Sequence, residues 1–272
     1  MKLLYLIANQ PITTSVAAFV AKVARQTSST VHILAAASSE KHMEQIEEGL
    51  ANLEEVFSGL EHTSTKVQGN ILDSLKDELR RKNYDMMLMG VHRRRKLFPS
   101  DFRILVNKIF RSCSIPIMLV RRVSDRFERM LVCTGGLESA ERVVELSAKL
   151  AGTAKLKATL LNVASAVPSM YTGLGEMEET IEELLVTETP LARHLRRSAE
   201  MLASKDIEAV VEVRHGDVVE VIIEEAAVGK YDLIVVGESG ARKLSGMLLG
   251  NVTQQIINRA ASAVLVYKTS EK

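Results

Sequence analysis

The chain has few of the features that mark secreted, membrane or metal-binding proteins. Its 272 residues include only two cysteines, Cys113 and Cys133, with no Cys-x-x-Cys pair and no pair of histidines nearby, which excludes a disulfide framework and a cysteine zinc site. No apolar run approaches the ~20 residues that span a bilayer. The opening apolar run breaks at Asn9 and Gln10, too early for a signal peptide, and is better interpreted as a strand. We therefore expect a globular, cytoplasmic protein outside the membrane.

Signatures of catalysis are also scarce. The sequence contains no Gly-x-Ser-x-Gly elbow, no histidine paired with a carboxylate at helical spacing, and no cluster of metal ligands. Ser239 and Ser245 have no base beside them in the sequence. We therefore name no catalytic or metal-binding residue, and we expect a binding protein rather than an enzyme.

What the chain does contain is an internal repeat. The stretch from Tyr84 to Gly90 matches the stretch from Tyr231 to Gly237 at an offset of 147 residues. Further upstream the offset is 127, so the second copy has about 20 extra residues between its second and third strands. A repeat of this length predicts two domains of the same fold.

Each copy alternates short β-rich runs with helical patterns. The expected strands are Leu3–Ala8, Val31–Ala36, Ser64–Val67, a run ending at Gly90 and Ile117–Val120 in the first copy, and Met130–Thr134, Ala158–Val163, Ala209–Val213, a run ending at Gly237 and Val264–Tyr267 in the second. This alternation indicates parallel βαβ units with helices on both faces of a sheet. We predict domains at residues 1–122 and 129–270, and we interpret the polar segment 121–128 between them as a linker.

The most distinctive stretch follows the fourth strand of the second copy. An apolar run stops at Gly237, Gly240 and Gly250 follow, and a helical pattern begins directly after Gly250. Glycine lets backbone amides approach a ligand closely, and the start of a helix favours a phosphate. The spacing differs from the dinucleotide fingerprint and from the Walker loop. The pattern nevertheless predicts an anion site.

This spacing of Gly, two residues, Gly, nine residues and Gly resembles the signature of the universal stress protein family, in which Ser or Thr comes next. Asn251 stands at that position. The resemblance covers nearly the whole chain as two tandem domains. It implies an α/β fold with two doubly wound domains, each a five-stranded, mostly parallel sheet of strand order 3-2-1-4-5 with helices on both faces. The ligand of such a fold lies at the switch point between strands 1 and 4.

In this family the fifth strands of two domains pair across a dimer interface. The resemblance therefore implies that Ile117–Val120 and Val264–Tyr267 pair within one molecule and form a pseudo-dimer. Such pairing would hide two hydrophobic strand edges that otherwise invite aggregation. A further homodimer of the whole chain is left open, and the sequence names no protein partner.

The resemblance also implies an adenine nucleotide, ATP or AMP, with or without Mg²⁺, in the second domain only. The matching positions are Thr134, Gly135, Val163, Gly237, Gly240, Arg242, Gly250, Asn251, Val252 and Thr253. The three glycines would cradle ribose and phosphate, Val163 would contact adenine, and Arg242 could reach a phosphate. Gly135 stands where the family usually has an aspartate, which removes an acceptor for the base. A ligand-free loop that needs glycine only for its turn is the alternative.

The first copy departs from the signature. Arg93 and Arg103 stand at the second and third glycine positions, where bulky side chains block close backbone approach, so we expect no nucleotide in this domain. The basic loop 92–96 could attract a phosphate or a polyanion. We do not expect nucleic acid as a partner, because no aromatic residues are interleaved for base stacking.

Two readings of function follow. The first is a nucleotide-binding stress-response or signalling module, with slow ATP hydrolysis left open. The second is a ligand-free interaction scaffold that binds a partner through the basic loop 92–96 or the insertion at residues 167–185.

Overall fold

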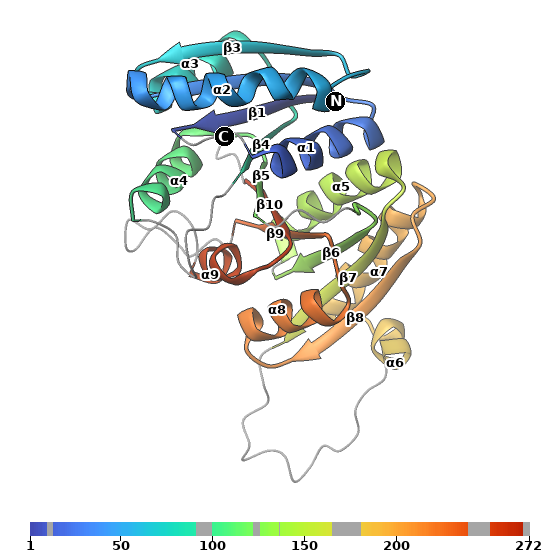
Figure 1. The fold of residues 1–272 in the computed structure, drawn as a ribbon. Helices are drawn as coiled ribbons and strands as arrows, with labels where there is room; N and C mark the ends of the chain where they lie inside the picture. The colour runs from blue at the N-terminus through green and yellow to red at the C-terminus, as the bar shows by residue number, and fades with distance from the viewer. Residues whose placement is uncertain are drawn as a thin grey trace.

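The computed structural model describes residues 1–9, 13–90, 100–121, 126–135, 137–164, 181–238 and 251–268. Its strands form one continuous sheet in the order β3-β2-β1-β4-β5-β10-β9-β6-β7-β8 (Figure 1). Neighbouring strands are parallel except β5 and β10, which are antiparallel. In each half, the strands therefore lie in the order third, second, first, fourth, fifth. The predicted doubly wound α/β class is confirmed.

The elements of the two halves follow each other in the same sequence. The first half contains β1 Lys2–Ala8, α1 Thr14–Gln26, β2 Thr30–Ala37, α2 Glu40–Val56, β3 His62–Gln68, α3 Ile71–Arg81, β4 Met86–Gly90, α4 Ser100–Ser112 and β5 Ile117–Val120. The second contains β6 Arg129–Thr134, α5 Leu137–Ala154, β7 Lys157–Ala164, α6 Ile181–Val186, α7 Pro190–Ala203, β8 Ala209–His215, α8 Val218–Val228, β9 Leu233–Gly237, α9 Asn251–Arg259 and β10 Ala263–Tyr267. The extra length of the second half lies between β7 and β8, as predicted.

The helices cover both faces of the sheet. Helices α1, α2, α5 and α7 contribute to one buried cluster, whereas α3, α4, α8 and α9 contribute to the other. Right-handed crossovers produce this division, because the chain changes its direction across the sheet after the third strand of each half. Figure 1 shows α1 and α5, one from each half, side by side. None of the helices in the described ranges is long and apolar enough to cross a bilayer.

The strands differ in polarity according to their place in the sheet. Central strands such as β5 and β9 are nearly continuous apolar runs, because helices bury both of their faces. The edge strand β3 carries many exposed polar residues instead. The other edge strand, β8, exposes Arg214 and His215 at its end and also Val210. Polar edges discourage pairing with a strand of another molecule.

The two halves join through their fifth strands. Val264 lies opposite Leu119, Leu265 opposite Met118, and Val266 opposite Ile117. All six side chains are fully buried. Because β5 and β10 run in opposite directions, the carboxyl ends of the first-half strands point away from those of the second-half strands.

The described end of the predicted linker at 121–128 packs against the first half. Phe127 is only 1% exposed and packs edge-to-face on Phe19 of α1, with ring centroids 5.6 Å apart. The side-chain amide of Gln26 donates to the Phe127 carbonyl at 3.2 Å. Because an aromatic side chain buries a large apolar area, Phe127 draws this end of the segment into the core between the halves. The boundaries at 122 and 129 stay predictions.

Candidate functional site

The site predicted in the second half lies where β6 and β9 meet. These strands are neighbours, with Leu131 beside Ile234 and Val132 beside Val235. Their other neighbours, β7 and β10, lie to opposite sides. This is a topological switch point, where doubly wound folds bind their ligands beyond the carboxyl ends of the strands. Gly135 follows β6 and Gly237 ends β9, so both lie at that crevice.

Thr134 has a structural task at the end of β6. Its hydroxyl donates to the Leu161 carbonyl at 3.3 Å, and the side chain is almost fully buried. Its own carbonyl accepts a hydrogen bond from the Asn162 side-chain amide at 2.8 Å. Asn162 was not among the predicted residues. A polar residue inside the apolar run of β7 was the available signal for it.

Gly135 has open space where a side chain would be. A Cβ atom at this position would meet no atom within 4 Å. Val163, near the end of β7, is half-buried against the apolar cluster on the α8 and α9 face. Val163 thus presents an apolar side chain near the end of β7, and a Cβ atom has room at Gly135.

Thr253 connects the first turn of α9 to the end of β9. Its hydroxyl donates to the Gly237 carbonyl at 3.1 Å, and its side chain is 1% exposed. Val252 packs half-buried on the same apolar cluster as Val163. The first N–H groups of any helix lack partners within the helix, so this contact holds a set of hydrogen-bond donors beside Gly237.

Other predicted residues fall outside the described part of the chain. Gly240, Arg242 and Gly250 do so, as do the basic loop 92–96 and most of the insertion. Asn251 begins α9, but its side chain is not described. The described site residues are Thr134, Gly135, Val163, Gly237, Val252 and Thr253.

The Tyr-Asp pair that the two copies share lies just before the fourth strand of each half. This is the end of the strand away from the predicted site. Asp232, just before β9, accepts the backbone N–H of Glu128 at 2.9 Å and that of Arg129 at 3.1 Å. Asp85 accepts the N–H of Lys2 at 2.8 Å in the first half. Each aspartate therefore joins the start of the first strand to the start of the fourth, so the motif is structural.

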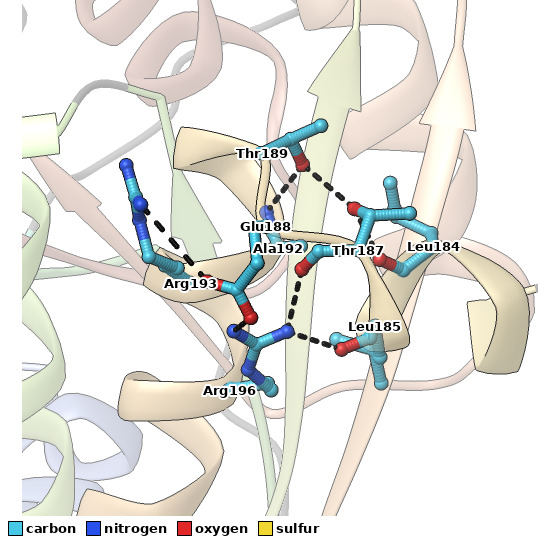
Figure 2. A network of polar contacts seen from close by, with 8 residues as sticks. All are labelled: Leu184, Leu185, Thr187, Glu188, Thr189, Ala192, Arg193 and Arg196. Carbon is cyan, nitrogen blue, oxygen red and sulfur yellow. Dashed lines mark hydrogen bonds and ion pairs between the residues drawn. The ribbon is translucent and has the colours of Figure 1, made fainter.

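The end of the insertion is anchored at the corner between α6 and α7. The Arg196 guanidinium donates to the carbonyls of Leu185 at 2.5 Å and Thr187 at 2.6 Å, and to the carboxylate of Glu188 at 2.9 Å (Figure 2). The Thr189 hydroxyl accepts a backbone N–H in the first turn of α7 and caps that helix. Within the described ranges, no three His, Cys, Asp or Glu residues group as a metal would require.

Comparison with known proteins places this geometry in a family. A model of the universal stress protein family matches residues 126–268, just over half of the chain. The chain belongs to the universal stress protein family. A curated relative, the universal stress protein E homolog of Haemophilus influenzae, is 26% identical over 251 residues, covering 86% of this chain and 80% of the relative. That alignment is long enough to include both halves of this universal stress protein.

Solved structures agree on the fold. A universal stress protein from Archaeoglobus fulgidus superposes with a TM-score of 0.71 at 16% identity, and 98% of each chain is covered. A protein from Pseudomonas aeruginosa described as a putative universal stress protein gives a TM-score of 0.68 at 17% identity, with 98% of this chain and 92% of that chain covered. Both likenesses extend over the whole two-half architecture.

Proposed function

We propose that this universal stress protein binds an adenine nucleotide, ATP or AMP, at the crevice between β6 and β9, and acts as a stress-response or signalling module. The observation that carries the proposal is the hydrogen bond from Thr253 to Gly237. It sets the start of α9 against the end of β9 at a topological switch point. A helix start in that position supports an anionic ligand, because the N–H groups of a first helical turn and the helix dipole favour negative charge.

The phosphate end of the nucleotide would lie along α9. The backbone amides of Asn251, Val252 and Thr253 are the donors, and Arg242 supplies a positive charge. Gly240 and Gly250 carry no side chain that would keep a phosphate away from the backbone. Mg²⁺ would be held by the phosphates rather than by a protein cage, as is usual for this ion.

The base would lie between β6 and β7. Val163 offers an apolar surface for adenine, and the open space at Gly135 leaves room for the ring. The Thr134 carbonyl already accepts from Asn162 but retains a second lone pair for the base. With glycine in place of aspartate at 135, the site should discriminate adenine from other bases less strongly than a site with the acidic side chain.

Binding in the second half alone follows from the first-half sequence. Arg93 and Arg103 replace the glycines that correspond to Gly240 and Gly250. Nucleotide binding would act by shifting the population of a surface that another protein recognises.

Calorimetric titration of the full chain with ATP, ADP and AMP, with and without Mg²⁺, tests the proposal. Gly240→Arg copies Arg93 and is expected to weaken binding at least tenfold. Gly152→Arg is the matched control, because it adds the same side chain on the exposed face of α5, where its Cβ would make only ordinary contacts. Absence of binding below millimolar nucleotide, or equal affinities of the two variants, would overturn the assignment.

The scaffold alternative is favoured by one observation. Val186 at the end of α6 is 79% exposed, beside the corner that Arg196 anchors. An exposed apolar side chain beside this hydrogen-bonded corner could contact a protein partner. This alternative predicts that no nucleotide is released when the purified protein is denatured, a result that mass spectrometry can establish.

A further inference from the structure

The first half contains a cavity of about 520 Å³ beyond the carboxyl ends of β2 and β3. Its lining comes from the residue after β2, the start of α3, and α4. The side chains that matter are Ser38, Asn70, Ile71, Ile104, Leu105 and Lys108. The volume lies within the range of small-molecule sites, roughly 300–1,000 Å³.

The cavity lies beside the position that corresponds to the proposed nucleotide site of the second half, because Ile104 and Leu105 of its lining correspond to Asn251 and Val252. The offset of 147 residues pairs Ile104 with Asn251. It also pairs Asn70 with Asp217, and the two side chains have the same role: each accepts two backbone N–H groups at the start of its helix, α3 or α8. The offset derived from the sequence therefore also relates the two halves in space. Because β5 and β10 are antiparallel, the two positions lie at opposite edges of the sheet.

One wall of the cavity is apolar. Ile104 is 50% exposed, and Leu105 is half-buried beside it. Ile71 completes this wall from α3. In the second half the residue that corresponds to Ile104 is Asn251, so the first half has an apolar residue where the second half has a polar one.

The polar groups of the cavity are donors. Asn70 uses its side-chain oxygen to cap α3, which leaves its amide N–H groups. The Ser38 oxygen accepts from the Asn9 amide at 2.8 Å, which leaves its O–H. Lys108 forms no ion pair or hydrogen bond with any residue in the part of the chain that the structure describes. Three donors, one of them positively charged, select a negatively charged acceptor.

We propose that this first-half cavity is a second ligand site, specific for a small organic anion with an apolar body and one acidic group. The acidic group pairs with Lys108 and accepts from Asn70 and Ser38, while the apolar body lies on Ile104 and Leu105. The degenerate half thus has a different specificity, in place of the nucleotide specificity that Arg93 and Arg103 remove. This proposal does not depend on nucleotide binding in the second half.

The experiment is calorimetric titration of the full chain with 4-phenylbutyrate, its uncharged analogue 4-phenylbutanol, and inorganic phosphate. Phenylbutyrate is expected to bind at a single site and at least tenfold more tightly than either of the other two. Equal affinity for acid and alcohol, equal affinity for phosphate, or no saturable binding would overturn the proposal.

Two variants and a control locate the site. Lys108→Gln, which copies Gln255 of the second half, should weaken phenylbutyrate at least tenfold and leave phenylbutanol unchanged. Ile104→Asn, which copies Asn251, should weaken both compounds. Lys41→Gln removes the same charge from the exposed side of α2 and should change neither. If Lys108→Gln retains wild-type affinity for phenylbutyrate, the assignment to this cavity is wrong.

Competition separates this proposal from the proposed function. ATP should not displace phenylbutyrate, and Gly240→Arg should leave phenylbutyrate binding unchanged. Displacement by ATP would mean that the anion occupies the second-half crevice, and would overturn the first-half site.

Discussion

Arg121 and Lys268 make the same contact in opposite directions. They follow the fifth strands of the two halves, and each reaches the last helix of the other half. Arg121 donates to the carbonyl oxygens of Ile257 at 2.6 Å and Ala260 at 3.3 Å, at the end of α9. Lys268 donates to two carbonyls at the end of α4, which lie 147 positions before those two residues. The repeat is therefore closed by a reciprocal pair of helix caps.

Loss of either cap should destabilise the whole chain. Arg121→Met and Lys268→Met are each expected to lower the free energy of unfolding by about 1–3 kcal/mol, because charged hydrogen bonds to the last carbonyls of a helix are lost. Urea unfolding measures the effect. Lys41→Met on the exposed side of α2 is the control, with a change within about 0.5 kcal/mol. Values for Arg121→Met and Lys268→Met no larger than this control would show that the caps contribute nothing.

Thr253 should contribute to both the stability of the chain and its affinity for nucleotide. Thr253→Val keeps the shape but removes the hydrogen bond to the Gly237 carbonyl, and should cost about 1–2 kcal/mol of unfolding free energy. It should also weaken nucleotide binding, because the start of α9 is no longer held against β9. Thr253→Ser retains the hydroxyl and is expected to restore most of the affinity. If valine and serine variants bind nucleotide equally well, the hydroxyl has no part in positioning the site.

Gly135→Asp should strengthen adenine binding. The position has room for a Cβ atom, which would meet no atom of the described residues within 4 Å. One new hydrogen bond to the base is expected to raise affinity for ATP about three- to tenfold over wild type. Titration with GTP serves as the comparison, and its affinity should not rise. An equal gain for both nucleotides would contradict a base contact at this position.

His32 should make stability depend on pH below about 6.5. It is buried, its Nδ1 lies 2.7 Å from the Thr63 hydroxyl, and its Nε2 lies 3.4 Å from a Glu78 carboxylate oxygen. Burial lowers the pKa of His32 below its ordinary value of 6.5, the Glu78 carboxylate opposes this, and Lys82 adds to it. Tyr84 stacks on the ring and donates to Glu78.

Because the native pKa is lowered, the unfolded chain binds more protons than the native chain as pH falls below 6.5. The free energy of unfolding should therefore fall with pH until the native pKa is reached, and show no contribution from His32 above that window. His194, whose pKa burial also lowers, adds to the same slope. His32→Thr copies Thr159, which accepts the Tyr231 hydroxyl at 2.7 Å in the second half, and should flatten the slope. Urea unfolding of the wild type and of His32→Thr at several pH values tests this prediction. A dependence of the unfolding free energy on pH that the substitution leaves unchanged would contradict it.

Much of the local structure could be predicted because it depends on local pattern. The strand at Ile117–Val120 has the predicted bounds, since a short apolar run is a complete signal in itself. Other strands are longer than predicted by a residue or two at their ends. The polar residues there, such as His62 in β3, pair in the sheet without belonging to an apolar run.

The site was only partly visible in the sequence. Gly237 and Thr253 could be named from a spacing, but their hydrogen bond joins residues 16 positions apart and depends on where α9 lies. Asn162 escaped notice because its role depends on Thr134, which precedes it by 28 positions on a neighbouring strand. Phe127 was included in a polar linker because the composition of a segment does not show which helix one of its side chains meets.

The sequence by itself determined the repeat, its offset of 147 residues, and the positions where the halves differ, because these are comparisons of one stretch with another. The tertiary structure alone decided which side chains reach from one half to the other and which residues line the first-half cavity. The reciprocal caps of Arg121 and Lys268 and the donors gathered around Lys108 come from elements far apart in the chain. No local pattern encodes such contacts, since they form only when the packing of the sheet and its helices brings those elements together.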